Sequence, residues 1–104
     1  MAKYKNVPEY IDGIRFASKA EARRYRELRL LEQAGEIYKL KVHKKWPIEV
    51  YGHHITTWTD DFSYYDKEGK YHVEDVKGFR TQRYRLIKKL MKAVHSIEIE
   101  EIEA

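Results

Sequence analysis

Hydrophobic and polar residues follow a helical period in two stretches of the chain. Ser18-Lys19-Ala20-Glu21 has the spacing of a capping box, so we expect a helix that runs from there to about Ala34 and stops at Gly35. Thr81 can cap a second helix, whose apolar stripe recurs every three or four residues and comprises Tyr84, Ile87, Leu90, Met91 and Val94. The pattern therefore predicts one helix early in the chain and one late.

Between and after these helices the apolar positions alternate with the period of a strand. Residues 40–50 read as one strand interrupted at Pro47, and residues 51–54 read as a turn. Residues 55–65 and 70–77 should form two paired strands, and a last strand starts at Ile97. The order helix, three strands, helix, strand predicts an α/β domain with a mixed sheet flanked by two helices.

The first 17 residues look like a lead-in rather than part of this core. Tyr10 to Phe16 contains Asp12-Gly13, a turn signal between apolar residues that is typical of a short hairpin. The whole chain, residues 1–104, is short enough for a single domain.

The amino-acid composition excludes several classes of protein and of functional site. The absence of cysteine excludes disulfides, thiolate zinc sites and cysteine nucleophiles, which fits a reducing, cytoplasmic setting. The N-terminus lacks the apolar core of a signal peptide, and no apolar run approaches the ~20 residues of a membrane span, so we expect no membrane association.

The charge is positive and unevenly distributed. Lys and Arg number 21 against 17 Asp and Glu. Basic residues crowd positions 77–92, whereas residues 98–103 are acidic. The basic stretch is either a solvated helix face or, as we expect from its nearness to Lys77, a surface that tracks DNA phosphates, with contacts from Arg80, Arg83, Arg85, Lys88, Lys89 and Lys92.

The predicted hairpin formed by residues 61–77 contains the candidate chemistry. A three-residue loop ending at Gly69 sets Asp61 beside or nearly opposite Asp75, and strand alternation places Lys77 on the same face as Asp75. A four-residue loop would shift the register by one residue and favour Asp60 instead of Asp61.

Two carboxylates on adjacent strands repel each other, and a hard divalent cation such as Mg²⁺ or Mn²⁺ would relieve that repulsion. Lys77 could then orient the attacking water and stabilise developing charge during phosphodiester hydrolysis. The competing interpretation is a solvated strand face on which Asp75 and Lys77 form a salt bridge of little energetic value.

At these residues the sequence resembles the PD-(D/E)xK nuclease superfamily. Asp61-Phe62 is followed across a hairpin by Asp75-Val76-Lys77, and Glu21 precedes both on the first helix. The resemblance extends over residues 18–102 and implies the αβββαβ restriction-endonuclease-like core. Residues 18–25 and 74–79 are similar to a family of small phage and prophage proteins of unassigned function, and the layout is distantly similar to Holliday-junction resolvases.

The resemblance implies a role for each matching residue. Asp61, Asp75, the Val76 carbonyl and Glu21 would bind the metal, and Lys77 would be the catalytic lysine. The superfamily's name expects proline before the aspartate, but this chain has Asp60 there. Glu21 also has a competing role as the far partner of the capping box.

The expected function is therefore that of an endonuclease that hydrolyses DNA, with branched or junction DNA as the implied substrate in phage replication or recombination. A homodimer would supply paired cuts and bury surface that a small core leaves exposed. The alternatives are a noncatalytic DNA-binding accessory module with the same fold and, less favoured, an enzyme that cleaves RNA.

Two further expectations concern residues outside this set. Strand alternation predicts that Glu74 points away from Asp75 and is a surface charge. The five histidines lack the spacing of a metal motif, so we expect no zinc site.

Overall fold

The protein is described by a computed structural model covering residues 7–104. Strands β1 (Glu9–Ile11) and β2 (Ile14–Phe16) form the expected hairpin. Asp12 and Gly13 turn the chain with φ values of 53° and 76°. Residues 1–6 of the predicted lead-in lie outside the described residues.

Helix α1 (Lys19–Gln33) begins and ends where the sequence predicts. Ser18 Oγ accepts a hydrogen bond from the Glu21 backbone amide at 3.2 Å, which satisfies one of the free N–H groups of the first turn. Gly35 follows the helix with φ 79°, a left-handed conformation that costs glycine little.

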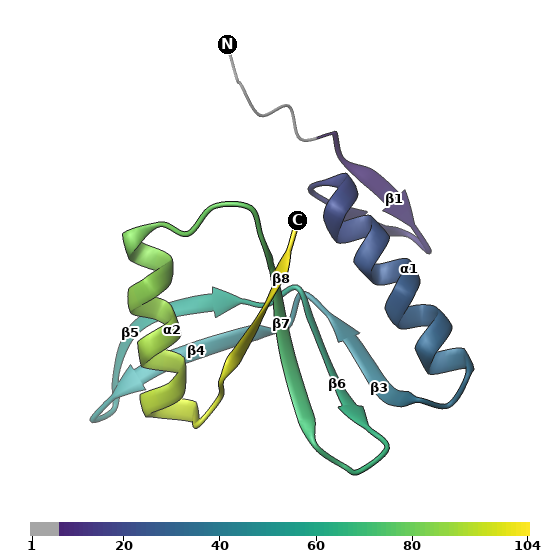
Figure 1. Cartoon of the computed structure of the whole chain (residues 1–104). Coiled ribbons are helices and arrows are strands. Elements are labelled where there is room, and N and C mark those ends of the chain that lie inside the picture. Colours follow the sequence, from purple (N-terminus) through teal and green to yellow (C-terminus); the bar gives the residue numbers. More distant parts are fainter. Residues whose placement is uncertain (1–6) are drawn as a thin grey trace.

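A mixed four-stranded sheet forms the centre of the molecule (Figure 1). Its order is β3 (Ile37–Val42), β6 (Phe62–Asp66), β7 (Tyr71–Lys77) and β8 (Ile99–Glu103). The β3–β6 and β6–β7 pairs are antiparallel, whereas β7 and β8 are parallel because helix α2 (Gln82–His95) makes the crossover between them. The predicted α/β architecture, with two helices and a mixed sheet, is confirmed.

The strand boundaries in the middle of the chain differ from the prediction. Residues 40–50 are not one strand, because β3 ends at Val42 and His43 adopts φ 58° before β4 (Lys45–Val50) begins. Residues 55–65 are likewise divided between β5 (His53–Thr59) and β6. Within residues 7–104, strands β4 and β5 pair only with each other, as a hairpin that projects from the sheet in Figure 1.

Local chemistry explains this hairpin. Pro47 is tolerated inside β4 because a strand in a two-stranded ribbon has one edge without ladder hydrogen bonds. The turn is confined to Tyr51 and Gly52, both with positive φ, and His53 already belongs to β5. The predicted turn over residues 51–54 is therefore two residues too long.

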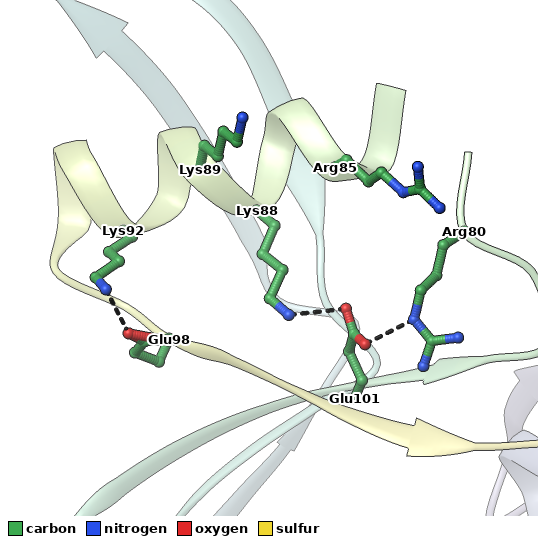
Figure 2. Close-up of a pocket in the computed structure, with 7 residues that line it drawn as sticks. All are labelled: Arg80, Arg85, Lys88, Lys89, Lys92, Glu98 and Glu101. Carbon is green, nitrogen blue, oxygen red and sulfur yellow. Dashed lines mark hydrogen bonds and ion pairs between the residues drawn. The ribbon is translucent and has the colours of Figure 1, made fainter. Parts of the chain in front are cut away.

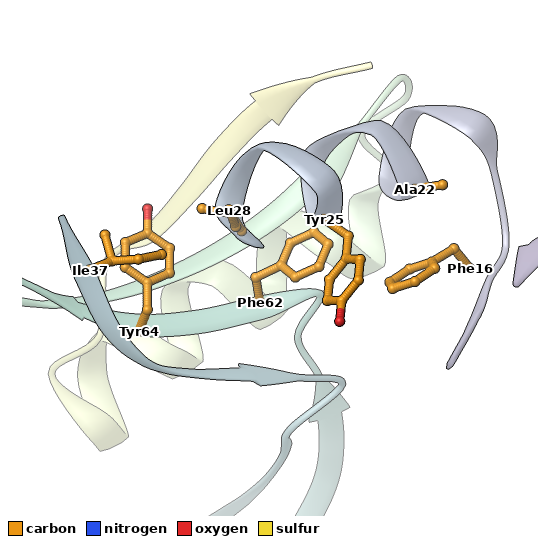
Figure 3. Close-up of a cluster of buried hydrophobic side chains, with 7 residues drawn as sticks. All are labelled: Phe16, Ala22, Tyr25, Leu28, Ile37, Phe62 and Tyr64. Carbon is orange, nitrogen blue, oxygen red and sulfur yellow. The ribbon is translucent and has the colours of Figure 1, made fainter. Parts of the chain in front are cut away.

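The two helices cover opposite faces of the sheet. Alternation along β7 and its neighbours puts Phe62, Tyr64 and Glu74 on one face, and Val73 and Ile99 on the other. The face covered by α1 holds an apolar cluster of Phe16, Ala22, Tyr25, Leu28, Ile37, Phe62 and Tyr64 (Figure 3). The face covered by α2 holds a second cluster of Ile48, Tyr84, Ile87, Met91 and Ile99.

The predicted apolar stripe of α2 is buried only in part. Tyr84, Ile87 and Met91 are buried, but Leu90 is half-buried and Val94 is 37% exposed. Neither helix in residues 7–104 is long and apolar enough to cross a membrane.

Glu74 is not the surface charge that alternation suggested. It does point to the face opposite Asp75, but α1 covers that face and leaves Glu74 only 1% exposed. Arg24 on α1 donates to both of its carboxylate oxygens, from Nε at 2.8 Å and from Nη2 at 2.6 Å, and the Tyr64 hydroxyl donates a third hydrogen bond. The prediction is wrong because a helix, not water, covers this face.

Candidate active site

The β6–β7 hairpin has the register that its turn chemistry predicts. Gly69 has φ 83°, and the Asp66 amide donates to the Lys70 carbonyl at 2.9 Å. Phe62 pairs with Glu74, so the position next along the ladder brings Asp61 to Asp75. The Asp61 carboxylate accepts a hydrogen bond from the Val76 amide at 2.7 Å, which directs it toward the end of β7 that carries Lys77.

Asp60 and Asp61 are adjacent, but their side chains have separate surroundings. Asp60 is fully buried and accepts hydrogen bonds from the Lys44 amide at 2.9 Å and from Trp46 Nε1 at 3.0 Å. Its carboxylate is thus occupied at the base of the β4–β5 hairpin. Of the two aspartates, Asp61 is the one that lies with the other predicted site residues.

Three elements bring potential metal ligands together around Asp61. Glu21 comes from the first turn of α1, His43 from the end of β3, and Asp61 from the residue before β6. One ligand atom from each lies within 4.8 Å of the others, a spacing at which one metal ion could contact all three. These residues therefore form a candidate metal-binding triad.

Asp75 and Lys77 lie next to this triad, on the face covered by α2. Lys77 Nζ is 3.1 Å from Asp75 Oδ2 and 4.1 Å from the centre of the Tyr84 ring. Asp75 Oδ2 is buried yet accepts no hydrogen bond of acceptable geometry from residues 7–104, so Lys77 contributes a charge contact only. A buried oxygen of this kind retains lone pairs for another ligand.

The electrostatics of the cluster reflect crowded carboxylates. Burial, and after it the neighbouring carboxylate of Asp75, raise the pKa of Asp61 to about 8, and the charge of Glu21 acts in the same direction. The raised pKa means that the ionised forms of these carboxylates repel one another, and a proton on Asp61 relieves that repulsion when no cation is bound. A bound cation would take the place of that proton.

The structure brings together all the residues predicted for the site from sequence. Glu21, Asp61, Asp75 and Lys77 converge, and the Val76 amide faces Asp61. Glu21 also lies at the helix cap, where its carboxylate is 3.4 Å from Ser18 Oγ. His43 was missed, because its neighbours in sequence contain no ligand motif and only the course of the chain after β3 brings it to Asp61.

Five of the six predicted DNA-binding residues, all except Arg83, line a groove between α2 and β8 (Figure 2). Several of them are paired with acidic residues. Arg80 contacts Glu101 at 2.7 Å and Glu103 at 2.6 Å, Lys88 contacts Glu101 at 2.9 Å, and Lys92 contacts Glu98 at 2.8 Å.

Arg80 and, after it, Lys88 lower the pKa of Glu101 to about 2, so this carboxylate stays ionised. By contrast, Arg85 and Lys89 form no ion pair with any residue in 7–104, and Arg83 donates only to Thr56 Oγ1, at 3.1 Å. Among the six predicted DNA-binding residues, the positive charge that is not paired with a carboxylate in residues 7–104 therefore lies at Arg83, Arg85 and Lys89.

Comparison with known proteins shows which family the chain belongs to. A family model described as "Protein of unknown function (DUF1064)" matches residues 1–101. The chain belongs to this DUF1064 family. No curated protein and no solved structure gives a significant match. The family match includes all the residues of the candidate site, from Glu21 to Lys77.

Proposed function

We propose that this protein is a metal-dependent DNA endonuclease of the PD-(D/E)xK type. The observation that supports the proposal best is the convergence of the Glu21, Asp61 and Asp75 carboxylates beside the Lys77 ammonium group. The order α1, β3, β6, β7, α2, β8 agrees with the αβββαβ core of that superfamily once the β4–β5 hairpin is treated as an insertion.

The residues present fit a divalent cation. Carboxylate oxygens suit Mg²⁺ and Mn²⁺, and the buried Asp75 Oδ2 makes no hydrogen bond within residues 7–104, although Lys77 Nζ lies 3.1 Å away. Glu21, Asp61, Asp75 and the Val76 carbonyl would hold the ion. When bound, it would supply a Lewis acid that stabilises charge on the phosphoryl oxygens.

Lys77 is placed to assist the same reaction. Its Nζ lies between the Asp75 carboxylate, at 3.1 Å, and the face of the Tyr84 ring, at 4.1 Å from the ring centre. An ammonium group here can donate a hydrogen bond to a water molecule or to a phosphate oxygen and stabilise the negative charge that develops in the transition state.

The charge distribution supports a nucleic acid as substrate. Arg83, Arg85 and Lys89 lie on α2, the same element that supplies Tyr84 beneath Lys77. Contacts from such residues to phosphates supply sequence-independent affinity. We propose branched or junction DNA as the substrate, on the basis of the distant resemblance to Holliday-junction resolvases, with a role in phage replication or recombination.

The first test is a cleavage assay on four-way junction, flap, duplex and single-stranded DNA with Mg²⁺, Mn²⁺ or EDTA. We expect cutting that EDTA abolishes and that Asp75→Asn and Lys77→Met each reduce by about 10²-fold or more, because both side chains act at the reacting phosphate. Glu49→Gln is a matched control, since Glu49 is an exposed carboxylate on the β4–β5 hairpin.

The opposite outcome is equally specific. If the wild-type protein binds these DNAs without cutting any of them, and the Asp75 and Lys77 variants are folded and bind equally well, the enzyme proposal fails. The protein would then be a noncatalytic DNA-binding accessory module. An RNA substrate of the same shape, run in parallel, separates cleavage of DNA from cleavage of RNA.

A further inference from the structure

His43 differs from the protein's other histidines in what its ring contacts. His72 is hydrogen-bonded to Asp66 at 2.8 Å and Glu100 at 2.7 Å, and His95 to the Pro47 carbonyl at 2.7 Å. His54 contacts Thr57, and His53 is exposed. Within residues 7–104 the His43 ring makes no hydrogen bond, although it is half-buried and lies near two carboxylates.

The backbone holds His43 in this place. The residue adopts φ 58°, a left-handed conformation that histidine tolerates better than most side chains, and its amide donates to the Asp61 carbonyl at 3.2 Å. The ring also lies against Phe16, with 5.8 Å between ring centres. The backbone hydrogen bond therefore positions His43 next to Asp61, and the contact with Phe16 restricts the His43 ring.

The spacing is compatible with a shared ion, and the described chain shows no direct hydrogen bond from the His43 ring. Ligand atoms from His43, Glu21 and Asp61 lie within 4.8 Å of one another, without a hydrogen bond between the imidazole and either carboxylate in the described chain. Metal–ligand bonds of about 2.0–2.2 Å separate ligands on opposite sides of one ion by about 4.0–4.4 Å. Next to Asp61, the buried Oδ2 of Asp75 makes no hydrogen bond within residues 7–104 and has the Lys77 ammonium group at 3.1 Å as its charged partner, so this carboxylate could also contact an ion.

We infer that His43 is a metal ligand and that its imidazole makes the site prefer Mn²⁺ to Mg²⁺. This inference rests on the proposed function, because it concerns the ion that the same carboxylates would hold. A site of carboxylates alone suits both ions, whereas Mg²⁺ requires a near-octahedral oxygen environment and binds imidazole poorly. Mn²⁺ binds nitrogen ligands less tightly than the later first-row transition ions do, but it accepts an imidazole in place of an oxygen ligand more readily than Mg²⁺ does.

The test measures metal binding without DNA, so it does not depend on cleavage. The full chain is titrated with Mn²⁺ and, separately, with Mg²⁺ by isothermal titration calorimetry, and Mn²⁺ binding is repeated by electron paramagnetic resonance. We expect wild-type protein to bind Mn²⁺ at least about tenfold more tightly than Mg²⁺, and His43→Gln to remove most of that difference by weakening Mn²⁺ binding about tenfold or more.

Two variants make the result specific. His53→Gln changes an exposed histidine and should leave both affinities unchanged. Asp61→Asn should weaken both ions together. Thermal unfolding in EDTA checks that each variant is folded.

The result that overturns the inference is a His43→Gln protein with the wild-type ratio of Mn²⁺ to Mg²⁺ affinity. If Asp61→Asn still abolishes binding in that case, the carboxylate site and the proposed nuclease stand without His43 as a ligand. If wild-type protein binds neither ion, the proposed metal dependence fails as well, and the cleavage assay decides the function separately.

Discussion

Two neighbouring aspartates have different surroundings in this protein. Asp60 is fully buried with two hydrogen bonds to the start of the β4–β5 hairpin, whereas Asp61 lies among carboxylates and a histidine. The first arrangement stabilises the fold, and the second is electrostatically unfavourable without a cation. We therefore expect a substitution of Asp60 to affect mainly stability and a substitution of Asp61 to affect mainly metal binding.

We predict that Asp60→Ala lowers the free energy of unfolding by about 2–4 kcal/mol, because it leaves the Lys44 amide and the Trp46 indole N–H buried without partners. Asp61→Asn should change stability by less than about 1 kcal/mol in EDTA and should abolish metal binding. Urea unfolding of both variants measures the difference. Equal destabilisation by the two changes would contradict this assignment.

The residues that sequence reasoning missed are those whose surroundings depend on tertiary structure. Asp61, Asp75 and Lys77 could be related to one another from a single local turn, since Gly69 fixes the register of their hairpin. His43 and Glu74 could not. His43 meets Asp61 only because the chain leaves the sheet after β3, and Glu74 is buried only because α1 covers its face.

At the scale of elements, a buried ion pair fastens α1 to the central sheet. Arg24 is 22% exposed and Glu74 1% exposed, and the pair is bidentate, with Tyr64 as a third partner. Such a pair fixes the position of a helix more than it adds net stability, but breaking it leaves a buried charge. The first turn of the same helix carries Glu21 to the candidate metal site.

We predict that Arg24→Ala lowers the free energy of unfolding by about 3 kcal/mol, because the Glu74 carboxylate loses its charged partner while buried. Arg26→Ala is the matched control on the same helix. Arg26 pairs with Glu9 at 2.9 Å but is 55% exposed, so its loss should cost under about 1 kcal/mol. Denaturant unfolding compares the two, and similar losses would refute the anchoring role.

The helices could be predicted because their caps and their apolar periodicity agree. The strand boundaries could not, because they depend on which strands pair with one another. Both helices follow from caps and apolar periodicity, with Ser18 and Thr81 accepting hydrogen bonds in the first turn as expected. The two long strand predictions failed at His43 and at Asp60, because alternation continues across both breaks. Only the change of pairing partner, from β6 to β5 and back, defines the true boundaries.

At the scale of the whole molecule, the candidate site is assembled from distant parts of the chain. Helix α1 supplies Glu21, and the residue that follows β3 is His43. Asp61 immediately precedes β6, and Asp75 lies within β7. An unfolded chain does not bring these groups together, so an ion that they bind in the folded state must stabilise that state.

We predict that Mn²⁺ at about 100 times its dissociation constant raises the free energy of unfolding by about 2.7 kcal/mol and raises the melting temperature correspondingly. EDTA should reverse the effect, and Asp75→Asn should show little of it. Thermal unfolding followed by circular dichroism measures the shift. A metal-induced shift of wild-type size in the Asp75→Asn variant would place the stabilising ion elsewhere.

The chain leaves the central sheet after β3 to form the β4–β5 hairpin and returns to the sheet at an adjacent point before β6. Where it joins the sheet, the His43 amide donates to the Asp61 carbonyl at 3.2 Å and the Asp60 amide to the Lys44 carbonyl at 2.9 Å, while Tyr51 at the far tip is 98% exposed. Insertions that begin and end at adjacent points displace little of their host. The outer part of this hairpin can therefore lengthen, shorten or change sequence during evolution without moving the candidate metal ligands at its base. In the proposed nuclease, the reach of the hairpin toward a substrate could then change independently of the residues that act on that substrate.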